Sequence, residues 1–104
     1  MESKALSNGL TMNGVDFRAG GGKVLANATL KLNKDESGRG GIDIPGFRIV
    51  ESQYGNQPCA VFFPDHQYER NGSTRRSRHV WFDSQADMRD VRDYIAKAFE
   101  EQEG

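Results

Sequence analysis

An alternation of apolar and polar residues from Lys23 to Asn33 restricts the fold of this chain more than any other feature. In an extended strand, residues two apart share a side, so the apolar residues lie on one face and the polar residues on the other. The two sets are Val24, Ala26, Ala28, Leu30 and Leu32, against Asn27, Thr29, Lys31 and Asn33. We therefore predict a long strand with one wet face, in a sheet that is covered on its other side.

Further strands are predicted on both sides of this one. Val15–Arg18 alternates and is followed by the flexible turn Gly20–Gly22, which indicates a preceding strand. Residues 34–41 carry charge and glycine without apolar anchors and predict a solvated connection. Strand formers then recur at Ile42–Ile44, with a bulge or an edge position at Pro45-Gly46, at Phe47–Val50, and at Pro58–Phe63.

Connections and a last strand complete the predicted sheet. Tyr54–Gln57 is a plausible hairpin loop, and Asp65–Ser77 is a polar connection. It leads to a short strand expected at His79–Phe82.

The last part of the chain predicts an amphipathic helix. Apolar residues recur there at helical spacing, at Met88, Val91, Ile95, Ala98 and Phe99. Ser84 followed by Asp87 has the form of an N-terminal cap, which satisfies the first free amides of a helix. The fold class expected is α+β, an antiparallel sheet of about four to five strands with one C-terminal amphipathic helix packed on it.

A chain of 104 residues has the usual length of one domain. Residues 1–13 show no sustained period, so we expect a flexible N-terminal extension there and a single domain over 14–104. The lone cysteine, Cys59, lies in an apolar run and is expected to pack in the core. Neither a membrane-spanning run nor a secretory signal is present, so a cytoplasmic protein without membrane partners is expected.

Residue patterns for catalysis are weak, and we expect a protein that is not an enzyme. His66 and His79 lack a cysteine or carboxylate at a spacing that recurs in metal sites, so no metal is expected. Gly20–Lys23 precedes a strand, whereas the glycine-rich phosphate loop opens a helix and ends in Lys-Ser/Thr. No cofactor is expected on these grounds.

The chemically distinctive segment runs from Arg70 to His79. It combines serine, threonine and asparagine with four arginines and no acid; the arginines are Arg70, Arg75, Arg76 and Arg78. Arginine binds phosphate through a planar fork, and the hydroxyl and amide side chains add single hydrogen bonds. Tyr68 and Trp81 flank the segment and would stack on bases if exposed. The alternative is a solvated hairpin tip whose arginines pair with nearby acids.

The order of these blocks resembles the SpoVG family of small bacterial regulators. The resemblance is carried by Val15–Arg18 with its glycine turn, Lys23–Leu30, Ile44–Glu51, Ala60–Pro64, the Gly72 turn and the terminal helix. It implies a divergent member of the family. It also implies a homodimer that joins sheet edges and binds DNA or RNA through the basic loop and the adjoining helix.

Carried over residue by residue, the resemblance implies phosphate contacts from Arg70, Arg75, Arg76 and Arg78. Arg89 and Arg92 would help if the start of the helix lies beside the loop. The leading hypothesis is therefore a non-enzymatic nucleic-acid-binding regulator. The alternative is a small, mobile-element type of inhibitor or adaptor that binds a protein partner through an exposed strand edge or the arginine loop. A net charge of −1 favours the alternative.

Overall fold

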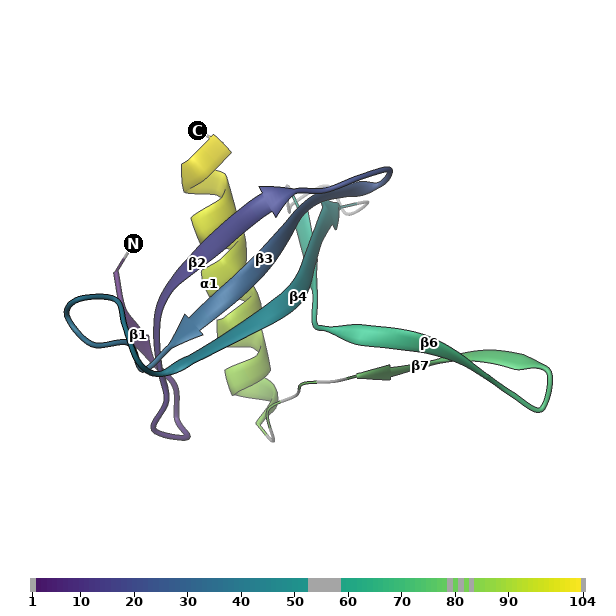
Figure 1. Ribbon diagram of the computed structural model, residues 1–104, viewed down its shortest axis with the longest axis horizontal. Helices are drawn as coiled ribbons and strands as arrows, with labels where there is room; N and C mark the ends of the chain where they lie inside the picture. The colour runs from purple at the N-terminus through teal and green to yellow at the C-terminus, as the bar shows by residue number, and fades with distance from the viewer. Residues whose placement is uncertain (1, 53–58, 79, 81, 83, 104) are drawn as a thin grey trace.

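The computed structural model describes residues 2–52, 59–78, 80, 82 and 84–103, with the backbone alone at 66, 67, 76, 78 and 103. In chain order its elements are β1 (Lys4–Ala5), β2 (Thr11–Ala19), β3 (Val24–Leu32), β4 (Ile42–Glu51), β5 (Cys59–Phe62), β6 (Asp65–Arg70), β7 (Ser73–Arg78) and α1 (Gln85–Glu103). Strands β1 to β5 form one antiparallel sheet in that order, and β6 and β7 pair separately as a two-stranded ribbon. Figure 1 shows α1 behind the sheet, which confirms the predicted α+β class.

The predicted strand from Lys23 to Asn33 is present as β3, at the centre of the sheet. Its inward residues Ala26, Ala28, Leu30 and Leu32 are all at most 3% exposed and belong to the main core cluster. Burying a leucine side chain contributes about 1.5–3 kcal/mol to folding, so this stripe is a main source of stability. Alternation along the strand thus gives both the strand and its buried face.

Strand β4 joins two stretches that the sequence suggested separately. Its pairing with β3 shifts register where Ala28 faces Phe47 and Leu30 faces Ile44, which leaves one extra residue on β4 at Pro45-Gly46. The bulge is therefore confirmed, and β4 is an inner strand between β3 and β5. Bulges of this kind bend a strand and increase its twist. The hairpin loop expected after β4 at 54–57 lies outside the described residues.

The C-terminal helix begins as predicted. Ser84 caps it, because its Oγ accepts a hydrogen bond from the Asp87 amide at 3.3 Å. Val91 and Ile95 are fully buried against the sheet. Helix α1 therefore covers one face of the sheet, and no helix or strand of the described residues covers the other, here called the open face.

Residues 2–13 are not the flexible extension that the sequence suggested for residues 1–13. Strand β1 pairs with β2, and Leu6 and Met12 are 5% and 0% exposed in the core cluster. The chain reverses between them in a turn closed by a hydrogen bond from the Leu6 amide to the Leu10 carbonyl, at 2.7 Å. A strand of two residues has no detectable period, and for that reason the sequence pattern missed it.

The region after β5 also differs from the prediction. The polar connection expected over Asp65–Ser77 is the ribbon β6–β7, and the strand expected at 79–82 is absent from its described residues, 80 and 82. Phe82 instead fills the core, 9% exposed, with its ring centroid 6.2 Å from that of Phe63. Phe82 therefore serves the core, and the mostly polar residues of the expected connection form the ribbon.

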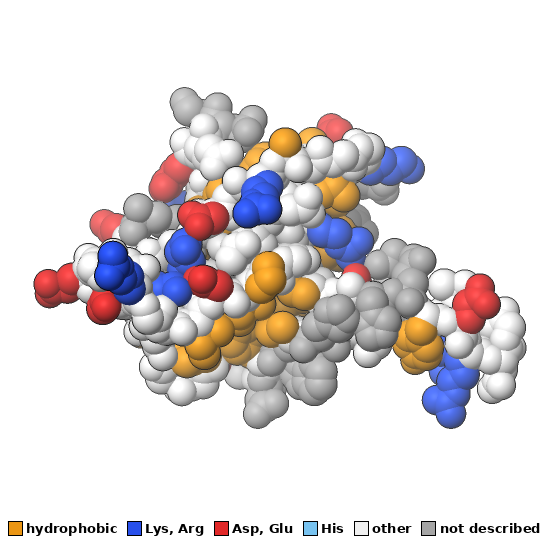
Figure 2. All heavy atoms as spheres, in the orientation of Figure 1, with side chains coloured by type: hydrophobic (Ala, Val, Ile, Leu, Met, Phe, Trp, Pro, Cys, Tyr) orange, Lys and Arg blue, Asp and Glu red, His pale blue; other side chains and the backbone are white. Residues whose placement is uncertain are grey.

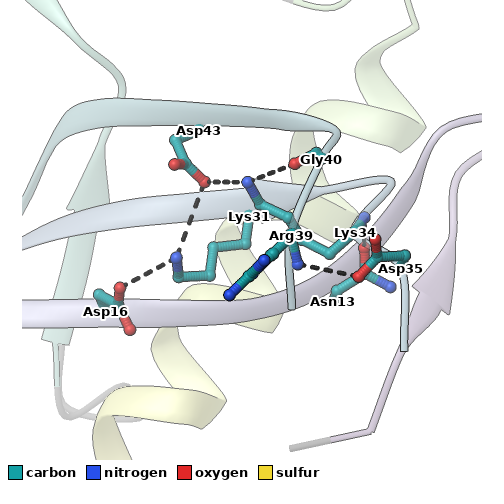
Figure 3. A network of polar contacts seen from close by, with 8 residues as sticks. All are labelled: Asn13, Asp16, Lys31, Lys34, Asp35, Arg39, Gly40 and Asp43. Carbon is teal, nitrogen blue, oxygen red and sulfur yellow. Dashed lines mark hydrogen bonds and ion pairs between the residues drawn. The ribbon is translucent and has the colours of Figure 1, made fainter. Parts of the chain in front are cut away.

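A polar network covers one end of the open face (Figure 3). Lys31 Nζ lies 3.1 Å from Asp16 Oδ2 and 3.7 Å from Asp43 Oδ1. Lys34 Nζ lies 2.8 Å from the same Asp43 oxygen and donates to the Gly40 carbonyl at 2.6 Å. The hydrogen bond to Asp16 raises the pKa of Lys31, and the one from Lys34 lowers the pKa of Asp43. These contacts tie β2, β3 and β4 to the connection at 33–41.

Candidate nucleic-acid interface

The ribbon β6–β7, here called the arm, carries the arginine segment. Its two strands pair from Asp65 with Arg78 to Arg70 with Ser73, and Asn71-Gly72 forms the turn between them. Both turn residues have positive φ, 54° and 77°, as a two-residue type I′ hairpin turn requires. Figure 1 shows the arm running away from the sheet and helix. The arm is therefore an element that projects from the rest of the molecule.

One face of the arm combines the residue types that bind nucleic acid. Residues that pair directly share a face, so Tyr68 lies with Arg75 and Arg70 lies with Ser73, and alternation places these two pairs on the same side. All four side chains are exposed, Tyr68 at 37%. No acidic residue occupies a position on this side between 68 and 75. The face therefore offers two guanidinium groups, a hydroxyl and an aromatic ring.

The register divides the predicted arginine cluster between two faces. Positions 76 and 78 pair with Gln67 and Asp65 and belong to the other face, which also holds Glu69 and Thr74. That face mixes basic with acidic positions. Arg70 and Arg75 are therefore the arginines of the cluster that the arm brings together without an acid.

The root of the arm is attached to the sheet at two places. Arg48 Nη2 of β4 donates to Asp65 Oδ1 at 2.9 Å, with both side chains partly buried. Pro64, itself buried, packs beside Gly46, where an added Cβ would lie 3.2 Å from the Pro64 Cβ. Gly46 also has φ of 95°, which disfavours any larger residue. The ion pair and this contact hold the direction in which the arm leaves the sheet.

Arg89 and Arg92 line a groove of about 690 Å³ between α1 and β5. The charged residues that line it with them are Asp93, Lys97 and Glu100. The Arg92 guanidinium lies 5.1 Å from the centroid of the Phe63 ring, a cation–π contact that uses it in packing. Figure 1 shows the arm running away from α1, the helix that carries the two arginines that the family resemblance groups with the arm.

Sequence reasoning missed the root of the arm and the shape of the arm itself. The pair Asn71-Gly72 is the strongest short-range sequence signal for a hairpin when it lies between strands with alternating apolar residues. The residues on either side of it lack that apolar pattern, so the two strands were not predicted. Arg48 stands at a wet position in a strand otherwise rich in apolar residues, and its pairing with Asp65 depends on tertiary structure.

The described part of the chain contains no group of three or more histidine, cysteine or acidic side chains that could hold a metal ion. Cys59 is buried, as expected, and burial raises the pKa of its thiol, which disfavours the reactive thiolate. His66 has only its backbone described, and His79 and Trp81 lie outside the described residues.

Comparisons with family models, curated proteins and solved structures found no match to this chain. No helix among the described residues is long and apolar enough to cross a membrane.

Proposed function

We propose that the protein is a non-enzymatic nucleic-acid-binding regulator of the SpoVG type, which binds DNA or RNA mainly through phosphate contacts from its arm. The observation that carries this proposal is the acid-free face of the arm with Arg70, Arg75, Ser73 and Tyr68. A projecting ribbon can lie along a nucleic-acid backbone without a clash from the rest of the molecule.

The spacing of the two arginines suits adjacent phosphates. Arg70 and Arg75 occupy diagonal positions across the ribbon, where Cα atoms are about 7–8 Å apart. Each guanidinium can bind a phosphate through two parallel hydrogen bonds, and Ser73 adds a third donor between them. Contacts of this type carry no base information, so low sequence specificity is expected.

The test is binding of fluorescently labelled 20-nucleotide DNA and RNA, measured by anisotropy at low salt. The Arg70→Ala/Arg75→Ala variant should bind about tenfold more weakly than the unaltered protein, because two charge-assisted contacts are lost. The matched control is Arg39→Ala/Lys97→Ala, which removes the same charge from exposed positions away from the arm. Equal losses in the two variants, or no binding by the unaltered protein, would reject the proposal.

The resemblance also leads us to propose a homodimer that joins β5 edges. Strand β5 ends the sheet on one side and pairs with β4 alone among the described strands. An edge of this kind has free backbone groups that can pair with another copy. Light scattering after size-exclusion chromatography should give twice the mass of the 11.6 kDa chain; a monomer at micromolar concentration would contradict this.

A second candidate function is favoured by the groove beside the same edge. A partner protein could add a strand to β5 and place charged side chains beside Arg89, Arg92 and Lys97, which share the groove with Asp93 and Glu100. This candidate predicts that Arg89→Glu abolishes a stable complex recovered from the native host. It also predicts that the arm variant keeps the complex.

A further inference from the structure

The open face of the sheet carries a row of four residues that crosses four strands. The strand register aligns Arg18 with Asn27, Asn27 with Arg48, and Arg48 with Phe62. Directly paired residues lie on the same face, and these alternate with the buried residues that face α1. Neighbouring strands are about 4.8 Å apart, so the row extends over roughly 15 Å.

The row combines an exposed aromatic ring with hydrogen-bond donors and no acid. Phe62 is 48% exposed, and the Arg48 guanidinium lies 5.8 Å from the centroid of its ring. Arg18 and Asn27 are exposed, and Arg18 has no ion-pair partner among the described residues. A phenyl ring that is half in water offers an aromatic face on which a base can stack.

Acidic residues of the open face are paired with lysines. Asp16, two residues from Arg18 on the same side of β2, pairs with Lys31, and Asp43 pairs with Lys31 and Lys34 (Figure 3). Figure 2 shows acidic side chains gathered at the left of this face, with hydrophobic and basic side chains bordering the root of the arm. An anionic nucleic acid therefore meets basic and apolar groups near Phe62, while Asp16 and Asp43 are already paired with lysines.

The row is continuous with the arm. Arg48, the third member of the row, holds Asp65, the first residue of β6, through its 2.9 Å ion pair. A nucleic-acid strand that lies across the open face therefore reaches the root of the arm. The ion pair places the row beside the root of the arm, where Asp65 belongs to the face of the arm opposite Arg70 and Arg75.

We propose that the open face binds a single-stranded nucleic acid, with one base stacked on Phe62 and with Arg18 and Asn27 in contact with its backbone or base edges. The inference rests on the proposed function, since the arm supplies most of the phosphate contacts. It adds the class of ligand: a single strand, whose bases are free to stack, in preference to a duplex, whose bases are already stacked.

The experiment compares Phe62→Leu and Phe62→Trp with the unaltered protein. Leucine keeps an apolar side chain but removes the aromatic face, and tryptophan keeps a face for stacking. Ligands are labelled 12-nucleotide single-stranded DNA and RNA, a duplex of the same length, and an abasic DNA strand that keeps its phosphates. Thermal unfolding checks that each variant is folded, as expected for a substitution at a half-exposed position.

We expect Phe62→Leu to weaken single-strand binding roughly 5- to 100-fold, the range for loss of one stacked base, and Phe62→Trp to preserve it. Both variants should bind the abasic strand like the unaltered protein. Tighter binding of the duplex, or equal binding of single strands by Phe62→Leu, would overturn the inference.

The arm variant separates this failure from failure of the proposed function. If Arg70→Ala/Arg75→Ala loses binding while Phe62→Leu does not, the arm proposal stands and the stacking inference is rejected. If Phe62→Leu loses binding while the arm variant does not, the open face binds and the arm proposal is rejected. A further variant, Phe62→Ala, tests protein docking. If Phe62→Ala loses affinity for a protein partner or for a second copy of the chain while Phe62→Leu keeps that affinity, the open face is a protein-docking surface and the inference is overturned.

Discussion

Ser7 and Asp87, eighty residues apart in sequence, are joined by two hydrogen bonds. Ser7 Oγ donates to Asp87 Oδ2 at 2.7 Å, and the Ser7 amide donates to Oδ1 at 3.1 Å. Asp87 is only 3% exposed, so these bonds satisfy a buried carboxylate in the first turn of α1. Further along the helix, Tyr94 Oη donates to the Glu2 carbonyl at 2.8 Å. The N-terminal segment is thereby fastened along α1.

Replacing Asp87 tests this attachment. Asp87→Ala should lower the free energy of unfolding by about 1–3 kcal/mol, because the Ser7 donors lose their acceptor at a partly buried site. Urea denaturation of Ser7→Ala, Asp87→Ala and the double variant should show a coupling of about 0.5–3 kcal/mol. Strictly additive effects would mean that the two residues do not act as a pair.

The turn of the arm gives a second prediction. Gly72 has φ of 77°, where an alanine costs about 1–2 kcal/mol, so Gly72→Ala should loosen the arm. Global unfolding should change little, since the arm is paired separately from the main sheet. Nucleic-acid affinity should fall, and amide exchange should quicken in 65–78 alone. Asn71→Gly is the control, because glycine tolerates the positive φ at position 71. Amide exchange that quickens throughout the main sheet would contradict an arm that is paired separately.

Asp43 gives a prediction on pH dependence. Its pKa is lowered, first by the hydrogen bond from Lys34 and further by the charge of Lys31. A lowered pKa means that the carboxylate contributes stability above about pH 4, its unfolded pKa, and that this contribution is lost as pH falls through the folded pKa. Nuclear magnetic resonance should show the Asp43 carboxyl titrating below pH 3.9, and Asp43→Asn should reduce the acid sensitivity of stability. Titration at or above the ordinary value would contradict the network in Figure 3.

The helix arginines should matter less than the arm for nucleic-acid binding. Arg89 and Arg92 face the groove beside β5, and Arg92 packs over Phe63. Arg89→Ala/Arg92→Ala should therefore weaken binding by less than Arg70→Ala/Arg75→Ala, although both variants lose two positive charges. An equal or larger loss, seen in the same anisotropy assay, would restore the helix start to the binding surface.

The spacing of apolar residues along the sequence predicted those helices and strands that have one continuous buried face. β3 alternates over its full length, and α1 has both an apolar stripe and a cap at Ser84, so each was recognisable by itself. Val80 and Phe82 have strand propensity, yet Phe82 contributes to the core without joining a sheet. Tertiary packing decided the role of these residues, and propensity alone could not.

The candidate site was predictable in composition but not in geometry. Four arginines without an acid between them marked the segment, whereas their division between two faces depends on the register set by Asn71-Gly72. The row on the open face depends on three separate strand pairings, none of which is visible from single residues. The links from Arg48 to Asp65 and Phe62 likewise depend on the fold.

The most direct test of the central claim is the salt dependence of binding to a single strand. The logarithm of the binding constant should fall linearly with the logarithm of salt concentration, with a slope of about −0.7 for each phosphate neutralised. Arg70→Ala/Arg75→Ala should reduce the steepness by about 1.4, and Arg39→Ala/Lys97→Ala should leave it unchanged. Identical slopes for the unaltered protein and the arm variant would show that the arm makes no phosphate contacts and would contradict the account.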